Sequence, residues 1–468
     1  MKTRKEHDFL GDLEIPDELY YGIQTYRAKQ NFNITGIPIS SEPLFIKAFA
    51  YVKKAAALAN RDCGVLDPKI CEAIEYACDR IIAGEFIDQF VSDMLQGGAG
   101  TSTNMNANEV IANIGLEYLG YKKGDYEKLH PNNHVNFSQS TNDSYPTALH
   151  IALYLKIEEF IAAQEVMVDA FKRKGKEFEN VLKMGRTQLQ DAVPMSLGME
   201  FNAMANNLTE DIAAMRKVLL HCCEINMGAT AIGTGINAPE GYAELVTKYL
   251  RQISGVPVVL EHDLIEATVD VGAYILVSAA LKRCAIKLSK ICNDLRLLGS
   301  GPRCGFNEIN LPSMQPGSSI MPGKVNPVIP EVVNQVCFYV IGADVTVGFA
   351  AEAGQLQLNV MEPVIAFSLF TSLDYLSNAM HTLKELCIDG ITANAEVTEK
   401  MVMNSIGIVT ALNPIIGYEA SAGIARECLK TGKSVHQIAV VEKKLLTQEK
   451  WDEIYSFENL INPKFINS

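Results

Sequence analysis

The chain has 468 residues, of which 48% are hydrophobic, and its formal net charge is -14 at pH 7. This length and composition predict a folded protein with a large apolar core and more than one domain. The negative charge argues against nucleic-acid or membrane-surface partners, because both are themselves negative. A small anionic substrate would instead need a locally positive pocket rich in hydrogen-bond donors.

The eleven cysteines are odd in number and contain no C-x-x-C pair, which favours reduced thiols over a disulfide framework. Cys71 and Cys78, like Cys284 and Cys292, have the spacing of small buried residues on one helix face. The N-terminal segment lacks the apolar stretch of a secretory signal, and no uninterrupted apolar run has the length of a membrane span. We therefore expect a soluble, cytoplasmic protein.

Helical periodicity dominates the chain. The first clear helix follows Asp67, a favourable N-cap, with Pro68 at its first position and Gly84 as its end. Its apolar residues recur every three or four positions and predict one buried face: Ile70, Ile74, Ala77, Cys78 and Ile81.

Two longer helices are expected further along the chain. Residues 147–182 lack proline and contain one glycine, Gly175. Residues 269–298 carry a three-four repeat of Leu281, Cys284, Leu288, Ile291, Leu295 and Leu298. Such helices predict a mainly α fold with a central bundle of long helices. Because these helices are unusually apolar, we expect several subunits to share one core, although burial in one large domain is the simpler alternative.

We expect three domains, with boundaries near residues 140 and 395, where "IDGITANAEV" interrupts the long-helix pattern. Residues 1–140 would form an N-terminal, mostly helical domain and residues 141–395 the long-helix bundle. Residues 396–468 would form a small C-terminal helical domain.

Polar, glycine-rich stretches separate the helices at 96–109, 130–146, 183–194, 226–237 and around Ser318. For any one of them, a role in turning the chain is the simpler interpretation. Taken together they share hydroxyls and amides, with single cations at Arg186 and Lys324. This inventory is typical of carboxylate recognition, with donors at Thr101, Ser140, Thr141, Asn142, Thr187 and Asn326.

Other kinds of site lack their motifs. The chain has no G-x-G-x-x-G, Walker A or G-x-S-x-G sequence, so nucleotide binding and a hydrolase elbow are not indicated. His130 and His134 lie four apart, but Pro131 stands between them and no cysteine or carboxylate cluster completes a metal set. We expect no metal and no cofactor.

The segment "GSSIMPGKVNP" at 317–327 resembles the signature of the fumarase/aspartase superfamily, whose members eliminate across a C–C bond to release fumarate. The other polar stretches resemble the remaining blocks of this superfamily, in its order: "GGAGTSTNMNANE", "SQSTNDSYPTA", "GRTQLQDAVP", "GATAIGTGIN" and "QLNVMEP". The resemblance covers almost the whole chain.

Within the superfamily, the aspartase branch is the most similar. "VIPEVVNQVCF" follows the signature where fumarases have "TQCE", and "NVMEP" stands where fumarases have "NVFKP" or "NVYKP". The resemblance therefore implies reversible deamination of L-aspartate to fumarate and ammonia. A class II fumarate hydratase is the alternative within the same fold, and a catalytically silent protein that reuses the scaffold is the alternative from another class.

The resemblance also implies a three-domain, mostly helical subunit that assembles as a homotetramer, with each active site built from three chains. Its general base would be Ser318, acting as an alkoxide. The ligands of the carboxylate that takes up charge would be Thr101, Ser140, Thr141 and Ser319, and those of the other carboxylate Thr187, Lys324 and Asn326. Asn142 would hold the amino group.

One position departs from the superfamily pattern. Gln188 stands where fumarases and many relatives have histidine after "GRT", although the usual glutamate partner is present as Glu331. An uncharged amide can still orient a carboxylate but cannot take up a proton as histidine does. The departure favours an aspartase over a hydratase and leaves open what position 188 does, so we place Gln188 among the substrate-binding residues.

Overall fold

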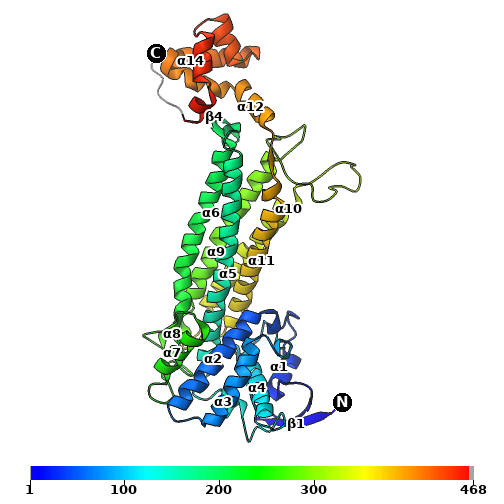
Figure 1. Cartoon of the computed structure of the whole chain (residues 1–468), viewed down its shortest axis with the longest axis vertical. Helices are drawn as coiled ribbons and strands as arrows, with labels where there is room; N and C mark the ends of the chain where they lie inside the picture. The colour runs from blue at the N-terminus through cyan, green and yellow to red at the C-terminus, as the bar shows by residue number, and fades with distance from the viewer. Residues whose placement is uncertain (1, 463–468) are drawn as a thin grey trace. The chain divides into compact units, whose positions relative to one another are not determined.

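The computed structural model describes residues 2–462 and is mainly helical (Figure 1). The chain divides into two compact units. Unit 1 contains the described residues up to 162 together with 211–285 and 338–377. Unit 2 contains 163–210, 286–337 and the described residues from 378 onward. The mainly α prediction is confirmed, and the three-domain division remains a prediction.

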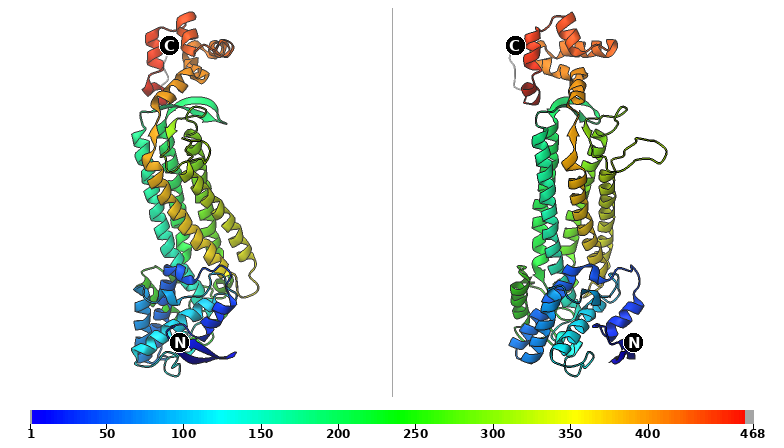
Figure 2. Two further views of the ribbon diagram at one scale, coloured as in Figure 1. Left: turned by 90° about the vertical axis from the view of Figure 1, so that its right-hand side faces the viewer. Right: turned by 45° about the vertical axis from the view of Figure 1, so that its right-hand side comes forward.

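Five long helices contribute residues to both units: α5 (Thr141–Glu177), α6 (Leu197–Leu219), α9 (Gly272–Leu298), α10 (Val328–Glu352) and α11 (Glu362–Leu386). Within each unit their segments run side by side as a bundle, as the two views of Figure 2 show. All six residues of the repeat predicted for α9 are buried. The central bundle of long helices is therefore confirmed.

Unit 1 adds two short sheets and a layer of shorter helices. The antiparallel hairpin pairs β1 (Thr3–Asp8) with β2 (Gly11–Pro16), and β5 (Glu224–Ile225) pairs in parallel with β6 (Val259–Leu260). The helices are α1 (Ile23–Asn31), α2 (Pro43–Asp62), α3 (Pro68–Ile82), α4 (Thr101–Tyr118), α7 (Tyr242–Ser254) and α8 (Glu266–Val269). Helix α2 packs against α3, α4 and α7.

Unit 2 adds a hairpin and the C-terminal helices. Strand β3 (Leu182–Thr187) pairs with β4 (Gln190–Ser196), and β7 (Ile309–Asn310) with β8 (Thr392–Ala393). The helices are α12 (Ala395–Asn404), α13 (Asn413–Ile416), α14 (Tyr418–Thr431), α15 (Gln448–Ile454) and α16 (Phe457–Ile461). Leu182 and Met184 of the hairpin are buried with apolar residues of these helices, including Val402 and Ile424, in one core cluster.

Helix α3 begins and ends where the sequence predicts. The Asp67 carboxylate accepts hydrogen bonds from the amides of Lys69 (2.8 Å) and Ile70 (3.4 Å), as an N-cap does. Gly84 follows the helix in the left-handed region, with φ +94°. The predicted apolar face is buried except for Ile70, which is half-buried.

Helix α5 begins at Thr141, six residues before the predicted start, and ends at Glu177 rather than at residue 182. Pro146 therefore lies inside the helix, where it has no N–H to donate to the carbonyl of Asn142. The side chain of Asn226 replaces that donor, with Nδ2 3.0 Å from the Asn142 carbonyl oxygen. This hydrogen bond from another loop thus allows Pro146 to lie inside α5, although the sequence pattern places the start of the helix after it.

Residues 183–194, predicted to form a loop, instead belong mostly to the β3–β4 hairpin. Its turn consists of Gln188 and Leu189, both with positive φ (55° and 62°). A turn of two consecutive residues with positive φ best matches the twist of the strands in a two-residue hairpin. Asparagine and glycine adopt this left-handed conformation more easily than glutamine and leucine do. Burial of Leu182 and Met184 of β3 against apolar residues of the C-terminal helices favours the hairpin despite these turn residues.

Helix α10 has the length and apolar composition of a membrane-spanning helix, and 28% of its most apolar 18-residue stretch is buried. The sequence analysis did not single it out, because Asn334, Gln335 and Asp344 interrupt its apolar runs. One such helix is weak support for a membrane span, since core helices of soluble proteins have the same composition. All eleven cysteines are free, and Cys71, Cys78, Cys284 and Cys292 are buried as expected.

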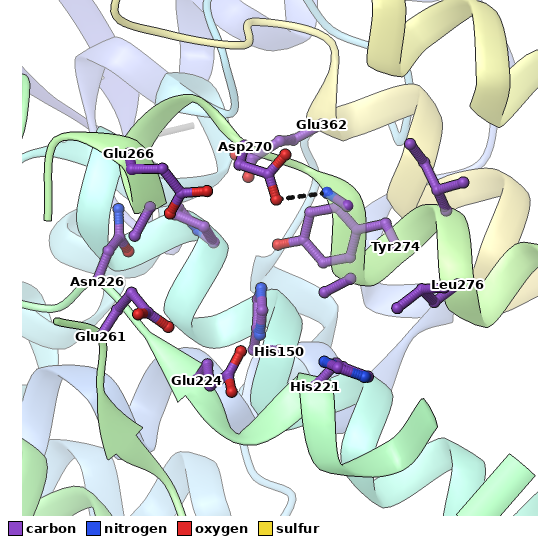
Figure 3. Close-up of a pocket in the computed structure, with 15 residues that line it drawn as sticks. His150, His221, Glu224, Asn226, Glu261, Glu266, Asp270, Tyr274, Leu276 and Glu362 are labelled. Carbon is purple, nitrogen blue, oxygen red and sulfur yellow. Dashed lines mark hydrogen bonds between the residues drawn. The ribbon is translucent and has the colours of Figure 1, made fainter. Parts of the chain in front are cut away.

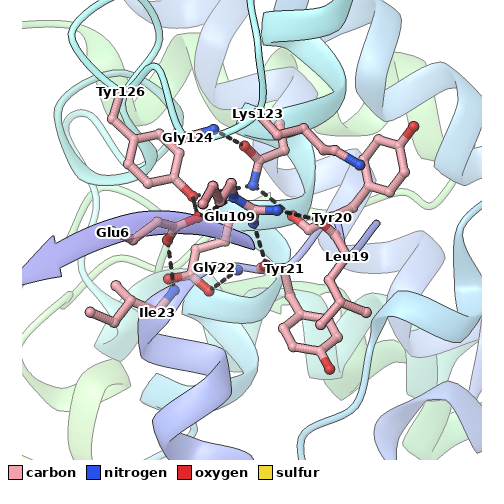
Figure 4. A network of polar contacts seen from close by, with 12 residues as sticks. Glu6, Leu19, Tyr20, Tyr21, Gly22, Ile23, Glu109, Lys123, Gly124 and Tyr126 are labelled. Carbon is pink, nitrogen blue, oxygen red and sulfur yellow. Dashed lines mark hydrogen bonds and ion pairs between the residues drawn. The ribbon is translucent and has the colours of Figure 1, made fainter. Parts of the chain in front are cut away.

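The N-terminus of α1 is held by two carboxylates from elsewhere in unit 1 (Figure 4). Buried Glu109 of α4 accepts hydrogen bonds from the amides of Gly22 (2.8 Å), Gln24 (2.9 Å) and Thr25 (3.1 Å). Glu6 accepts from the amide of Ile23 at 2.8 Å. Helix α1 has no side-chain cap of its own, so these carboxylates satisfy its free N–H groups and complement its dipole.

We predict that Glu109 makes the opening of α1 depend on pH. Burial and the nearby Glu6 carboxylate raise the pKa of Glu109 from 4.5 to about 7, against its hydrogen bonds. Between these values the folded state keeps a proton that the unfolded chain releases, so stability falls as pH rises through this window and levels off above it. Hydrogen exchange should show the free energy of opening α1 falling from pH 5 to 7 in the wild type.

Glu109→Gln should lack this slope, whereas the exposed carboxyl variant Glu127→Gln on the same unit should keep it. Parallel pH profiles for wild type and Glu109→Gln would contradict the prediction.

Candidate functional site

The N-terminus of α5 carries three of the predicted binding residues. The Ser140 hydroxyl accepts from the amide of Asn142 (3.2 Å), and the Asp143 carboxylate accepts from the amide of Ser140 (2.9 Å). This arrangement is similar to a capping box, with the amide of Asn142 in place of that of Asp143, and it fixes the backbone at the start of the helix. Ser140, Thr141 and Asn142 are therefore displayed on a rigid turn.

Asp143 also anchors a second loop. Its other carboxylate oxygen accepts from the amides of Gly228 (3.2 Å) and Thr230 (2.9 Å). The Asp143 side chain is fully buried, and burial raises its pKa to about 7 against these hydrogen bonds. One buried carboxyl group thus joins the 226–237 loop to the start of α5.

Asn142 is held from both sides by that loop. Its Nδ2 donates to the carbonyl of Ala231 at 2.7 Å, while its own carbonyl accepts from Asn226. Among residues 2–462 its side-chain oxygen has no recorded hydrogen bond, which leaves that oxygen able to accept from a ligand N–H.

A buried lysine lies behind Thr141. Lys53 Nζ donates to the side-chain oxygens of Asn104 (2.6 Å), Gln139 (2.9 Å) and Asn136 (3.0 Å). Asn104 in turn donates to the Thr141 hydroxyl at 3.1 Å. Burial lowers the pKa of Lys53 to about 7, with the attraction of Asp143 acting in the opposite direction. The network fixes the orientation of Thr141 and contributes positive charge beneath it.

Thr101 is the first residue of α4, and its hydroxyl donates to the carbonyl of Gly98 at 2.7 Å. The preceding Gly100 lies so close to Tyr145 of α5 that a Cβ atom would come within 2.1 Å of the ring. Glycine is therefore required for the start of α4 to pack on the first turns of α5. A cavity of about 780 Å³ in unit 1 is lined by Ser140 and Thr141 together with residues of the 132–139 and 230–237 segments.

Ser318 lies on the loop between β7 and α10 of unit 2, and its Oγ is positioned as an acceptor. The amides of Met321 (3.0 Å) and Ile320 (3.2 Å) both donate to it. Two backbone N–H groups aimed at one hydroxyl oxygen stabilise negative charge there. This local geometry is the kind that the predicted alkoxide needs.

The base of this loop is closed by two hydrogen bonds. The Gly317 amide donates to the carbonyl of Lys324 at 2.7 Å, and Asn326 Nδ2 donates to the carbonyl of Gly317 at 2.8 Å. A Cβ at Gly317 would lie 2.7 Å from the Lys324 carbonyl oxygen, so only glycine allows this closure. The side chains of Ser319 and Lys324 are exposed.

Thr187 and Gln188 lie exposed at the tip of the β3–β4 hairpin. Beneath them, the fully buried Glu308 pairs with Arg186 and with Lys183, whose Nζ is 2.9 Å from the carboxylate. This cluster ties the hairpin to the segment that leads into the Ser318 loop. Among the described residues, no hydrogen bond joins Gln188 to Glu331.

The ten predicted site residues fall into two groups. Unit 1 contains Ser140, Thr141 and Asn142 on one turn at the start of α5, and Thr101 at the start of α4, which packs on α5 where Gly100 meets Tyr145. Unit 2 contains Thr187, Gln188, Ser318, Ser319, Lys324 and Asn326, on the hairpin and the signature loop. Within unit 2 no recorded hydrogen bond joins the described residues of the hairpin tip to those of the loop.

The sequence analysis missed the residues that support these groups, namely Lys53, Asn104, Asp143, Asn226 and Glu308. Asn104, Asp143 and Asn226 lie inside the polar stretches 96–109, 130–146 and 226–237, so the predicted site residues near them in sequence could have indicated a role for them. Lys53 interrupts the apolar face of an alanine-rich helix, which is a recognisable anomaly. Glu308 had no comparable signal, because its partners are more than 100 residues away in sequence.

Comparison with known proteins gives a consistent result over nearly the whole chain. Residues 11–342 match a family described as lyase, and residues 408–462 match the fumarase C C-terminus. Aspartate ammonia-lyase of Helicobacter pylori strain J99 is 59% identical over 460 residues, covering 98% of both chains. That of Escherichia coli K12 is 54% identical over 463 residues, covering 99% of this chain and 97% of the relative.

Solved structures agree. A fumarate lyase:delta crystallin from Brucella melitensis bound to cobalt has a TM-score of 0.95 and 50% identity, covering 98% of this chain and 99% of its own. The class II fumarase of Schistosoma mansoni has a TM-score of 0.93 and 33% identity, covering 99% and 100%. Because the lyase match spans more than half of the chain and the relatives nearly all of it, the chain belongs to the fumarase/aspartase superfamily of lyases.

Proposed function

We propose that the protein is an aspartate ammonia-lyase, which converts L-aspartate reversibly to fumarate and ammonia. The observation that carries this proposal is the high sequence identity to aspartate ammonia-lyases along almost the entire chain. The signature loop supports it, because Ser318 retains both the hydroxyl and the two amide donors that a basic oxygen needs.

In the proposed mechanism, the Ser318 alkoxide removes a proton from the substrate carbon next to one carboxylate. The electron pair of that C–H bond moves into this carboxylate and forms a dianionic aci-carboxylate. Collapse of the intermediate forms the C=C bond of fumarate and expels the amine as ammonia. The carbon acid is very weak, so stabilising the dianion is the main demand on the site.

The binding roles follow the chemistry of the side chains. We assign Thr101, Ser140, Thr141 and Ser319 to the carboxylate that becomes the dianion, since hydroxyl donors strengthen as charge develops there. Thr187, Lys324 and Asn326 hold the other carboxylate. Asn142 accepts a hydrogen bond from the substrate amino group. Its Nδ2 is held by the carbonyl of Ala231, which leaves its side-chain oxygen to accept from the ligand. Gln188 orients a carboxylate as a neutral donor.

The alternative is a fumarate hydratase, which the likeness to a class II fumarase keeps open. The aspartate ammonia-lyases are much more similar in sequence, and Gln188 lacks the proton-accepting ring nitrogen of histidine. Pure protein is incubated with aspartate and separately with malate while fumarate absorbance is followed. Fumarate from aspartate alone supports the proposal, fumarate from malate alone supports the hydratase, and neither in a folded protein supports a silent scaffold.

We further propose a homotetramer of three-domain subunits, located in the cytoplasm, in which residues of several chains complete each active site. Within unit 1, α10 exposes Phe338 (61%), Val345 (57%) and Phe349 (72%) with the spacing of one helix face. Exposed apolar area of this kind is typical of a surface covered by another subunit. The free, mostly buried cysteines support a reducing compartment.

Phe349→Asp should disrupt this assembly, because it places a charge on the apolar face of α10. Light scattering after size exclusion should give wild type a mass four times that of the 51.3 kDa chain, and the variant a smaller species. Phe9→Asp, at a fully exposed hairpin position, is the matched control and should leave the mass unchanged. A wild-type mass of one chain would refute the tetramer.

Ser318→Ala should lower kcat for aspartate by about 10²–10⁴-fold, the usual contribution of a positioned general base. KM should change little, because the carboxylate ligands remain. Steady-state assays of fumarate formation measure both constants. Ser313→Ala, an exposed serine on the same connection, should behave as wild type. Retention of more than a tenth of wild-type kcat would exclude Ser318 as the base.

Gln188→His should change the KM for aspartate by about 3–10-fold, as expected when one hydrogen-bonding partner is altered. It should not create malate dehydration, because a hydratase also needs its water and proton relay in place. Both substrates are assayed in parallel, with Gln190→His, on the opposite strand of the turn, as the control. Robust conversion of malate by Gln188→His would show this prediction to be wrong.

A further inference from the structure

Lys53 of α2 is a buried cation that the mechanism above leaves unused. Its side chain is fully buried, and Nζ donates to the side-chain oxygens of Asn104 (2.6 Å), Gln139 (2.9 Å) and Asn136 (3.0 Å). Three acceptors use all three N–H donors of an ammonium group, so this network favours the charged form of the lysine. Among the described residues, these hydrogen-bonding partners of Nζ are all neutral amides.

The surroundings of this cation are otherwise negative. Asp143 acts on Lys53 from the same region, and Asn226, which donates to the Asn142 carbonyl, also lines a cavity of about 550 Å³. Figure 3 shows the carboxyl groups that line this cavity: Glu224, Glu261, Glu266, Asp270 and Glu362. A carboxylate bound at the start of α5 would approach these acids, so it needs a nearby positive charge that solvent does not screen.

Asn104 connects the cation to Thr141. An ammonium group only donates, so the side-chain atom of Asn104 that faces Lys53 must be the oxygen. The Ser144 hydroxyl donates to the same oxygen at 3.1 Å. The Nδ2 of Asn104 is therefore directed to the Thr141 hydroxyl oxygen, also at 3.1 Å. Lys53 thus fixes which end of the amide meets Thr141.

This contact leaves the hydroxyl proton of Thr141 available to a ligand. Its oxygen accepts from Asn104, and among the described residues no acceptor is recorded for its proton. Thr141 lines the cavity of about 780 Å³ together with Ser140. Hydrogen bonds in a chain polarise one another, so an O–H group whose oxygen already accepts becomes a stronger donor. The chain from Lys53 through Asn104 therefore ends in a polarised donor at this cavity.

We propose that Lys53 is a positioning residue for the elimination, acting through Asn104 to make Thr141 a strong donor to the carboxylate that becomes the dianion. The inference rests on the proposed function, which assigns that carboxylate to Thr141. Lys53 does not touch the substrate. Burial lowers the pKa of Lys53 to about 7, and negative charge that develops at the carboxylate favours the protonated lysine. The chain thus stabilises the dianion more than the ordinary carboxylate.

Two variants test the chain in the full-length protein. Lys53→Met removes the cation but leaves three buried oxygens without a donor, so its thermal unfolding is measured as well. Asn104→Asp keeps the shape of the side chain and pairs with Lys53, but its carboxylate accepts the Thr141 proton and turns it away from the cavity. Each variant should lower kcat for aspartate by about tenfold or more while KM stays within about threefold.

The matched control is Lys54→Met, which removes the neighbouring lysine of α2. Its Nζ pairs with Asp79 at 2.7 Å and has no recorded contact with Asn104 among the described residues. This variant should keep the wild-type kcat and KM.

Binding of two probes separates the dianion from the ordinary carboxylate without turnover. Succinate carries ordinary carboxylates, whereas the nitronate form of 3-nitropropionate has two negatively charged oxygens on a planar group, as an aci-carboxylate has. Isothermal titration calorimetry should show nitronate binding weakened by about tenfold or more in Lys53→Met and Asn104→Asp, and succinate binding by less than about threefold. Lys54→Met should bind both probes as wild type does.

A double-mutant cycle with Thr141→Val tests whether Lys53 acts through Thr141. In the Thr141→Val background, Lys53→Met or Asn104→Asp should weaken nitronate binding by less than about twofold further. Wild-type kcat in Asn104→Asp, equal losses of nitronate and succinate binding, or losses that multiply in the double variants would overturn the proposal, as would a wild type that binds neither probe. Thr141-dependent nitronate losses in a protein without lyase activity would instead refute the proposed function and leave Lys53 as a determinant of anion binding.

Discussion

The buried carboxyl group of Asp143 is the contact on which the arrangement of unit 1 depends. One of its oxygens fixes the first turn of α5, and the other holds the 226–237 loop through two backbone amides. That loop supplies Asn226, which satisfies the carbonyl freed by Pro146 and so allows α5 to begin at Thr141. A single side chain thus determines where the longest helix starts and which hydroxyls its N-terminus presents.

Burying Asp143 is costly, and the structure compensates for it locally. Hydrogen bonds from three amides favour the charged carboxylate, while desolvation opposes it. Lys53 is buried in the same region and contributes opposite charge without forming a direct ion pair with Asp143. Its ammonium group is satisfied by three amide oxygens instead. Such a network is rigid because removing any member leaves a buried polar group unpaired.

Unit 2 also contains a buried acid, but this acid forms direct ion pairs with basic side chains. The buried Glu308 carboxylate receives Lys183 and Arg186 from the β3–β4 hairpin. The hairpin tip can then hold Gln188 and Leu189 at positive φ, a conformation that would be unfavourable in an isolated turn. In both units, a buried acid fixes the backbone segment that carries polar residues proposed to bind the substrate.

Local sequence determined much of this protein. The cap at Asp67, the buried face of α3, the repeat of α9 and the superfamily signature around Ser318 all follow from residues within a few positions of one another, where spacing and capping decide the outcome. Tertiary structure decided the start of α5, the conversion of 183–194 into a hairpin, and the roles of Lys53 and Glu308. Those features depend on partners distant in the chain, such as Asn226 for Asn142, whose identity no local pattern encodes.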